Sequence, residues 1–387
     1  MISLTHMERQ IIQVLMKNEG FSRFEISKSV GSNAGTVWRA VNRLIRKQYV
    51  QEGEQISISV GRPWRALTLN PALGYMIGLD LEATNVRGAL VDFALNTISQ
   101  RRFPLPLDCS TDRAGRALLK MYRTLSAKAG RRRILGVGVG IPGFCEATEG
   151  RIISYDENPS WAGFAVKKRL AREIAHPLFA EHNAVAVTLG ENWFHYHGKI
   201  NNLICVVIRA GVAAGFVING LIFRGAADGG AGEIAHLKVR HGGEICSCGQ
   251  RGCLRQYVSG RALAKKMTQL GLGADEKGNT LLALAELANK GRVPASKLVH
   301  QAGQSLGMAI GHMVNILGTK QVVISSDLTK AGQIFLAPLE SELQRAVPQS
   351  GEIMPKVRFS SLDGYAGALG AAVLASQEIC GIYERVA

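Results

Sequence analysis

Residues 236–253 read HLKVRHGGEICSCGQRGC and bring one imidazole and three thiols into a short segment. The imidazole belongs to His236, and the thiols belong to Cys246, Cys248 and Cys253, which gives the spacing His-x9-Cys-x-Cys-x4-Cys. Three thiolates and one imidazole form a tetrahedral donor set that structural zinc prefers. We therefore expect one structural zinc ion per chain, with all four coordination positions filled by protein and none open to water.

The alternative for this segment is a set of unrelated buried thiols. The chain begins MISLTHMERQ, which lacks the basic start and apolar run of a signal peptide. No stretch reaches the ~18 uninterrupted apolar residues of a membrane span. We therefore expect a cytoplasmic protein with no membrane partner, whose thiols stay reduced, so that clustered cysteines indicate metal rather than disulfides. Gly249 and Gly252 would give the loop the backbone conformations it needs.

Length and charge set the frame for the rest of the chain. The 387 residues suggest two or three domains, and an apolar fraction of 47% with 20% charged residues excludes disorder for the bulk of the chain. The formal net charge of +16 favours a polyanionic partner, most simply nucleic acid. The alternative is a basic surface that only keeps the protein soluble.

Residues 1–70 have the pattern of a separate basic domain, with ten lysines and arginines against five acidic residues. An apolar stripe predicts a first helix, Ser22 can cap a second short helix that Gly31 ends, and Ser32 or Asn33 can cap a third. Two helices, a glycine-containing turn and a third helix form the rhythm of a helix-turn-helix.

The third of these helices carries a polar face suited to DNA. Asn and Arg near a helix N-terminus can contact base edges, and later Arg and Lys can hold phosphates. The alternative is a three-helix bundle with a solvated basic face. The side chains expected to face solvent and to contact double-stranded DNA are Asn33, Thr36, Trp38, Arg39, Asn42, Arg43, Arg46 and Lys47.

Segment 49–69, YVQEGEQISISVGRPWRALTL, alternates polar and apolar residues around two expected turns. One turn is expected at residues 52–54 and the other at residues 61–63. Such a pattern predicts a two-stranded wing. Arg62 and Arg65 would then lie where a wing meets the DNA backbone.

From Tyr75 onward the pattern changes to mixed strands and helices. It predicts two α/β lobes that face a cleft. The expected strands cover residues 76–81, 86–91, 97–103, 203–208, 215–218 and 321–324. The expected helices cover residues 112–129, 260–270, 280–290, 295–317 and 367–377.

Several motifs together resemble the ROK family, named for repressors, unidentified open reading frames and sugar kinases. GRPWRALTLNP (61–71) is similar to the family's junction between winged helix and body. GGAGEIAHLKV (229–239) with CSCGQRGCL (246–254) is similar to its zinc signature. GVGVGIPG (136–143) and NPSW (158–161) resemble its sugar-side loops. The resemblance covers nearly the whole chain.

The resemblance implies an α/β protein with an N-terminal winged helix-turn-helix followed by a two-lobed, actin-like sugar kinase fold. The domains expected on this basis are a DNA-binding domain at residues 1–70, a first lobe at 71–181 and a second lobe at 182–362. The C-terminal helix, within residues 363–387, would pack back on the first lobe. The second lobe would carry the zinc site and an oligomerisation surface.

Four departures from the family's kinase motifs point away from catalysis. Asp-x-Gly-Gly-Thr is replaced at residues 80–84 by Asp-Leu-Glu-Ala-Thr, in which Glu82 would repel phosphate. The position of the catalytic Asp is occupied by Asn183, whose amide cannot take a proton from a sugar hydroxyl. The second phosphate loop reads Arg-Ala-Gly-Val-Ala-Ala-Gly at residues 209–215, and Ser-Ser-Asp at 325–327 replaces an adenosine-side Gly-Gly-Gly. We therefore expect a protein that is not an enzyme.

The resemblance also implies a sugar pocket that is only partly kept. Asn158, Glu233 and His236 match family sugar contacts, and Asn183 can still hydrogen-bond a hydroxyl. The glutamate that usually follows Cys-Leu is Arg255, which would shift the preference toward an acidic or phosphorylated sugar. The alternative is that Arg255 pairs with Glu233 or another acid and that no sugar binds.

These observations predict a DNA-binding transcriptional regulator, most simply a repressor of carbohydrate metabolism, that responds to a sugar or sugar derivative. A homodimer or higher homo-oligomer would place two third helices ~34 Å apart on a pseudo-palindromic operator. One rival is an active ATP-dependent sugar kinase with an accessory DNA-binding head. Another is a regulator controlled by a protein partner.

Overall fold

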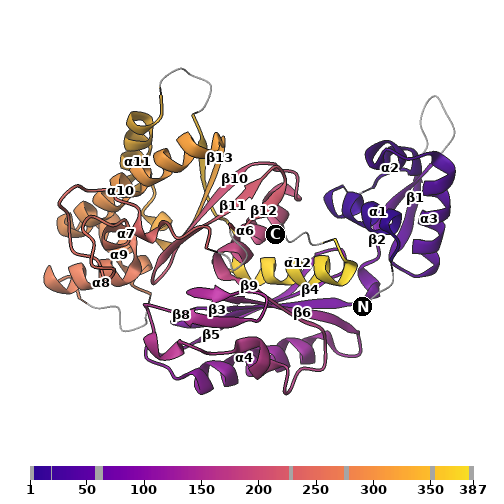
Figure 1. Ribbon diagram of the computed structural model, residues 1–387, viewed down its shortest axis with the longest axis horizontal. Coiled ribbons are helices and arrows are strands. Elements are labelled where there is room, and N and C mark those ends of the chain that lie inside the picture. The colour runs from indigo at the N-terminus through magenta and orange to yellow at the C-terminus, as the bar shows by residue number, and fades with distance from the viewer. Residues whose placement is uncertain are drawn as a thin grey trace.

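The computed structural model describes residues 4–18, 20–56, 64–225, 230–273, 279–348 and 354–382. Figure 1 shows an N-terminal head at one side of a two-lobed body, with a β-sheet in each lobe. This architecture confirms the expected fold, a winged helix-turn-helix followed by a kinase-like α/β body.

Three short helices form the head. They are α1 (His6–Lys17), α2 (Arg23–Val30) and α3 (Ala34–Arg46). The Ser22 side chain caps α2 in a capping box, and Gly31 ends the helix in the left-handed conformation, as expected. Asn33, rather than Ser32, caps α3. Ile12, Ile26, Val37 and Leu44 from the three helices are fully buried together, and this shared core fixes the helix packing.

The wing consists of β1 (Val50–Ile56) paired antiparallel with β2 (Trp64–Leu69). The turn expected at residues 52–54 was wrong, because β1 runs straight through these positions. The register shifts between Glu52 and Gln55, so the strand absorbs the extra residue as a β-bulge. The turn expected at residues 61–63 lies outside the described residues.

The first lobe is built on a five-stranded sheet in the order β5-β4-β3-β6-β9, with β3, β4 and β5 antiparallel and β3, β6 and β9 parallel. One face of the sheet is covered by α4, and α12 lies on the opposite face (Figure 1). Because both faces are covered, β3, β4 and β6 are buried throughout. The bounds are β3 (Tyr75–Leu81), β4 (Asn85–Asp92), β5 (Thr97–Pro104), α4 (Thr111–Ala129), β6 (Ile134–Ile141), β7 (Phe144–Glu146), β8 (Arg151–Ser154), α5 (Val166–Leu170) and β9 (Leu178–His182).

The second lobe holds another five-stranded sheet, in the order β12-β11-β10-β13-β14. The long helix α10 packs along α11, and α7, α8 and α9 lie on the same side of the sheet (Figure 1). The bounds are α6 (Asn183–Tyr196), β10 (Leu203–Ile208), β11 (Val212–Ile218), β12 (Leu221–Phe223), α7 (Arg255–Val258), α8 (Gly260–Gln269), α9 (Thr280–Asn289), α10 (Val293–Leu317), β13 (Gln321–Ser325), α11 (Gln333–Ala346), β14 (Lys356–Phe359) and α12 (Ala366–Cys380).

The predicted strands and helices of the body are confirmed, with small differences at their ends. Two elements extend three residues beyond the expectation: α12 ends at Cys380 rather than residue 377, and β11 starts at Val212 rather than Gly215 because pairing with β10 continues to the Ile208–Val212 pair. Among the described residues, no helix is both long enough and apolar enough to cross a lipid bilayer.

Candidate functional site

Helix α3 lies on the side of the head away from the body (Figure 1). Its buried side chains face α1 and α2, while Trp38 is 55% exposed and Arg39 is exposed beside it. The Asn33 side-chain oxygen accepts a hydrogen bond from the backbone N–H of Thr36 at 2.8 Å. Asn33 therefore serves first as the helix cap, and the N-terminal turn of α3 is held open to solvent.

Two of the expected DNA contacts are tied to a buried carboxylate on α1. The Nε of Arg43 donates to Glu8 Oε1 at 3.0 Å, and Lys47 Nζ lies 3.5 Å from Glu8 Oε2. Burial raises the pKa of Glu8. The hydrogen bond from the Thr5 backbone and the charges of Arg43 and Lys47 outweigh this effect, so the net shift of the pKa is downward. Arg43 and Lys47 were expected to be left to solvent; Lys47 is exposed and Arg43 is half-buried, and both side chains lean toward α1.

The Asn42 side chain is also held from within the head. Its Oδ1 accepts a hydrogen bond from Arg23 Nη2 at 3.2 Å, and the same Arg23 nitrogen lies 2.7 Å from Glu52 on the wing. Arg65 Nη1 lies 4.0 Å from the same carboxylate, and Arg62 falls outside the described residues. The side chains of α3 that remain outward are Trp38, Arg39 and Arg46, with Thr36 half-buried beside them.

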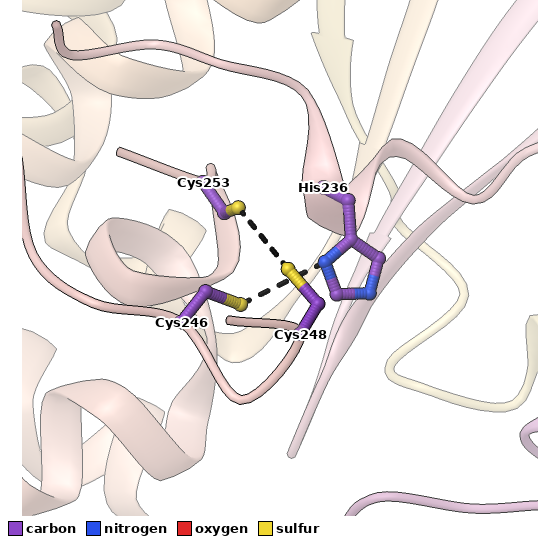
Figure 2. A group of neighbouring side chains, drawn as sticks. All are labelled: His236, Cys246, Cys248 and Cys253. Carbon is purple, nitrogen blue, oxygen red and sulfur yellow. Dashed lines mark hydrogen bonds between the residues drawn. The ribbon is translucent and has the colours of Figure 1, made fainter. Parts of the chain in front are cut away.

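The expected metal ligands converge in the second lobe (Figure 2). Their ligand atoms all lie within 4.8 Å of one another. His236 Nδ1 is 3.7 Å from Cys246 Sγ, and Cys248 Sγ is 3.7 Å from Cys253 Sγ. A tetrahedral site with Zn–S bonds of about 2.3 Å has ligand atoms about 3.8 Å apart. The four side chains therefore match the size and donor chemistry of a zinc site.

The loop and its charges also suit a metal. Gly249 and Gly252 adopt φ values of 80° and 74°, as the tight loop requires, and a Cβ on Gly252 would lie 1.8 Å from the Arg240 carbonyl oxygen. Burial and the neighbouring Cys248 and Cys246 thiols raise the pKa of Cys253, while Lys238 Nζ, 3.1 Å from its Sγ, opposes that shift. Burial raises the pKa of the Cys246 thiol, but hydrogen bonds from the Cys248 backbone and neighbouring side chains bring it down to about 6.

A cavity of about 1190 Å³ lies between the lobes. Asn183, Glu233, His236 and Arg255 all line it, as expected, whereas Asn158 does not. The Asn158 amide instead donates to the carbonyl oxygens of Leu107 at 3.2 Å and Cys109 at 3.0 Å. In this conformation Asn158 therefore supports the loop that forms one wall of the cavity.

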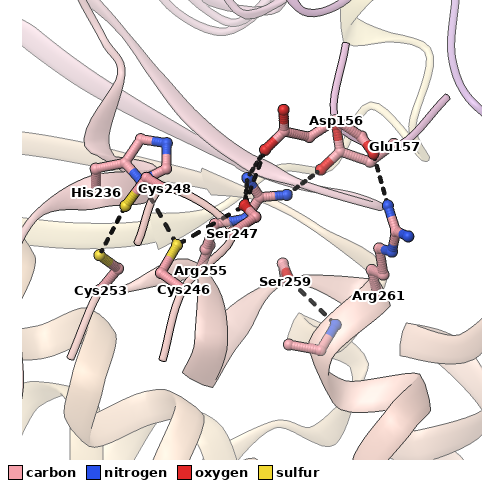
Figure 3. Close-up of polar contacts among 11 residues, drawn as sticks. Asp156, Glu157, His236, Cys246, Ser247, Cys248, Cys253, Arg255, Ser259 and Arg261 are labelled. Atoms are coloured by element: carbon pink, nitrogen blue, oxygen red, sulfur yellow. Dashed lines mark hydrogen bonds and ion pairs between the residues drawn. The ribbon is translucent and has the colours of Figure 1, made fainter. Parts of the chain in front are cut away.

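Arg255 bridges the two lobes at this cavity (Figure 3). Its guanidinium contacts the Asp156 carboxylate, and its Nη2 lies 3.0 Å from Glu157 Oε1. Arg255 therefore pairs with acids of the protein itself, as the alternative held, but its partners are Asp156 and Glu157 rather than Glu233. Burial raises the pKa of Asp156, but the contacts with Arg255 and Ser247 outweigh burial. The net shift of the pKa is downward, so the carboxylate stays ionised. Because its charge is matched, Arg255 no longer favours an acidic sugar.

A second ionic cluster lies where the degenerate phosphate motifs meet. Arg209 Nη1, from the second lobe, lies 2.8 Å from Asp80 Oδ2 and 3.1 Å from Glu82 Oε1. Arg87 Nη1 lies 2.9 Å from the same Glu82 oxygen. Burial raises the pKa of Asp80 to about 6, although Arg209 opposes the shift. Two arginines and two acids thus fill this part of the cleft with matched charge.

Sequence reasoning missed several residues of the cleft. His182 ends β9, lines the cavity and is buried; burial lowers its pKa although nearby Glu233 favours the charged form. Its position beside Asn183 was the available signal. Asp156 and Glu157 directly precede Asn158, but nothing in the sequence showed that they would meet Arg255 across the cleft.

Comparisons with known proteins agree with this geometry. The profile of the ROK family matches residues 76–378, and a profile of winged helix-turn-helix DNA-binding domains matches residues 4–51. The xylose repressor of Caldicellulosiruptor bescii is 28% identical over 93% of this chain and 92% of its own length. The transcriptional dual regulator NagC of Escherichia coli is 25% identical over 91% and 88%. A glucokinase of Halalkalibacterium halodurans is 28% identical over 79% of this chain and 96% of its own.

Among solved structures, a ROK family transcriptional regulator described as a homologue of the E. coli MLC protein superposes with a TM-score of 0.79. It covers 97% of this chain and 96% of its own, at 19% identity, so it supports the fold alone. A DNA-binding head of the winged helix-turn-helix class is thus joined to a body of the sugar-kinase class. The chain belongs to the ROK family.

Proposed function

We propose that this protein is a sugar-responsive DNA-binding transcriptional regulator, and that its usual action is repression. The observation that carries this proposal is the outward basic face of α3 on a head attached to a body with altered kinase motifs. Trp38, Arg39 and Arg46 would contact the major groove, and Arg43, Lys47 and Arg65 would lie beside the DNA backbone. Several relatives that match over most of the chain are named as repressors, which supports the assignment.

The body would bind without phosphorylating. Asn183 stands at the position of the catalytic base, and an amide is no proton acceptor at neutral pH. Glu82 and Arg209 hold matched charges where ATP phosphates would require cations and open backbone. Both features support a binding protein rather than an enzyme.

The ligand we propose is a neutral sugar. Asn183, Glu233 and His236 would hydrogen-bond its hydroxyls, Arg255 would hold the two lobes beside it, and Asn158 would support the adjacent loop. The relatives' names mention xylose and N-acetylglucosamine, which makes these sugars and glucose suitable probes.

We further propose a structural zinc ion at His236, Cys246, Cys248 and Cys253, because the donor set and its spacing suit that metal. When bound, the ion would cross-link the loop and stabilise the second lobe.

We also propose the organisation of the chain. We place the domain boundaries after residues 70, 181 and 362, and propose a homodimer on a pseudo-palindromic DNA site. We also propose a cytoplasmic location, because the proposed partner is DNA.

A second candidate function, an active sugar kinase, is favoured by the similarity to a glucokinase. A coupled assay of ATP turnover on D-glucose, D-xylose and N-acetyl-D-glucosamine separates the two. We expect no turnover above that of the sugar-free protein. Clear turnover on any of the three would contradict the assignment as a binding protein.

The DNA-binding half is tested by selecting duplexes from a random library on the purified full chain. We expect enrichment of one motif made of two inverted half-sites about one helical turn apart. Trp38→Ala would serve as the variant with a damaged reader surface, and its selection should lose the motif. Recovery of no motif by the unmodified chain would overturn the proposal.

A further inference from the structure

The floor of the cleft contains an ionic cluster made by both lobes. Asp80 and Glu82 come from the end of β3, Arg87 from β4, and Arg209 follows β10 of the second lobe. Arg87 also donates to the carbonyl oxygen of Gly364, at the turn that leads into α12, at 2.9 Å. The cluster therefore joins three parts of the molecule: the first sheet, the second sheet and the start of α12.

The chemistry of this cluster suits a joint that can change state. Asp80 is fully buried, and among the described residues its Oδ1 and Arg209 Nη2 have no hydrogen-bond partner. A buried ion pair adds little to stability compared with apolar packing, yet removing one partner is costly. The pair is therefore better suited to fixing the position of the two lobes than to strengthening the fold.

The first turn of α12 lies directly on this cluster. A Cβ placed on Gly367 would come within 2.1 Å of Asp80 Oδ2, so helix backbone and carboxylate are in close contact. At the next residue of the helix, a Cβ on Gly78 of β3 would lie 1.8 Å from the Ala368 carbonyl oxygen. At Gly78 and Gly138 of the first sheet, the helix backbone therefore approaches the strand backbone directly.

The second lobe grips the same helix from the other side. A Cβ on Gly190 of α6 would lie 2.1 Å from the Ala366 carbonyl oxygen, and one on Gly370 would lie 1.7 Å from the Ala186 carbonyl oxygen. Figure 1 shows α12 between the first sheet and α6. Because close-packed backbones cannot absorb a displacement, a change in lobe position must move α12.

The far end of α12 reaches the DNA-binding head. Ile379 and Cys380 belong to the same buried cluster as Tyr49, which directly precedes the wing. Tyr49 meets Phe93 of the first lobe edge-to-face, with ring centroids 5.7 Å apart. A Cβ on Gly381 would lie 3.1 Å from the Arg9 guanidinium carbon of α1. Both α1 and the start of the wing are therefore linked to the end of this helix.

We propose that the Asp80–Arg209 pair is an interlobe latch and that α12 transmits its state to the DNA-binding head. This inference rests on the proposed function, because the output of the latch is DNA affinity. A sugar that changes the lobe position would strain or release the pair, shift the helix clamped on it, and reposition the head.

Amide hydrogen exchange on the full chain tests the latch without any ligand or DNA. In Arg209→Met, we expect exchange about tenfold faster both at residues 364–370 and at the distant contact formed by residues 47–50 and 377–382. Arg123→Met is the matched control, because Arg123 pairs with Glu173 on the surface of the first lobe only. It should leave both regions unchanged.

Faster exchange confined to the cleft end of α12 would overturn the transmission, and unchanged exchange at both ends would overturn the latch. If Arg209→Met fails to fold, Glu82→Gln, which removes one of the two acids that Arg209 contacts, is measured in the same way. It should show the same two regions with smaller changes, and its failure to do so would equally overturn the proposal.

DNA affinity supplies the functional readout. On a duplex selected by the unmodified chain, D-xylose, D-glucose or N-acetyl-D-glucosamine should change the affinity of that chain by about tenfold and that of Arg209→Met by less than about twofold. If a sugar changed the DNA affinity of Arg209→Met as much as that of the unmodified chain, the latch would be contradicted. A chain that binds no duplex would contradict the proposed function instead, while the exchange result would still stand by itself.

Discussion

The side chains on the proposed DNA-binding face of α3 fall into two groups. Trp38 and Arg39 extend outward, whereas Arg43 and Lys47 are drawn toward the buried Glu8 carboxylate. The sequence correctly indicated which residues lie on the helix surface, because the buried stripe repeats at helical spacing. It could not show that an acid on α1 restrains two of them, since that contact joins positions far apart in the chain.

This division predicts different effects for two substitutions. Arg39→Ala should weaken binding to a selected duplex by ~1–3 kcal/mol while changing non-specific binding little, because a base contact is lost. Lys47→Ala should weaken all duplexes similarly and lower the slope of log affinity against log salt by about one. Fluorescence anisotropy at several salt concentrations measures both. If Arg39→Ala weakened binding to specific and non-specific DNA equally, Arg39 would not be making the proposed base contact.

Glu191 gives a prediction about pH. Its side chain is fully buried in α6, with His195 Nε2 at 3.6 Å, and burial raises its pKa to about 7 although Ser360 opposes the shift. The folded chain then holds a proton that the unfolded chain releases, so this residue reduces stability as pH rises from about 4.5 to 7. Glu191→Gln should therefore raise the free energy of unfolding at pH 8 by about 1–3 kcal/mol and have little effect at pH 4.5.

Urea unfolding at the two pH values measures this difference. Glu340→Gln, at an exposed position on α11, is the control and should change stability at neither pH. A Glu191→Gln variant that is less stable than the unmodified chain at pH 8 would show that the carboxylate is ionised and well paired in the folded protein.

Among the helices and strands, features set by neighbouring residues could be predicted from the sequence, whereas features set by distant pairing could not. Ser22, Gly31 and the residues before α3 marked the helix ends because caps act within a few residues. The bulge in β1 was mistaken for a turn, because Gly53 and its acidic neighbours read alike in both. Only the pairing with β2, set by the whole wing, distinguishes a turn from a bulge.

The metal loop gives the clearest prediction about an element. Cys248→Ser should release the metal and lower the melting temperature of the body, because metal-binding energy is also folding energy. Cys205→Ser is the control: this thiol is buried in β10, outside the metal cluster, so the variant should lose stability but keep its metal. Elemental analysis with thermal unfolding measures both quantities. Full metal content in Cys248→Ser would refute the ligand assignment.

For the whole molecule, the two-lobed fold could be predicted because its motifs are local and specific, but the contacts between lobes could not. Arg255 was recognised as unusual, yet its partners Asp156 and Glu157 lie in the other lobe. Asn158 matches the family motif but does not line the cavity, and its amide donates to the carbonyl oxygens of Leu107 and Cys109 instead. Such outcomes depend on three-dimensional packing, which residue spacing does not encode.

The central claim is that a sugar in the cleft changes the DNA affinity of the head. The most direct measurement is the dissociation constant of the full chain for a selected duplex, with and without D-xylose, D-glucose or N-acetyl-D-glucosamine. Glu233→Gln, altered in the cleft and far from α3, is the matched variant. We predict that one of these sugars shifts the constant by about tenfold for the unmodified chain and much less for the variant. Identical shifts in both proteins, or tight DNA binding that none of the three sugars alters, would contradict the account.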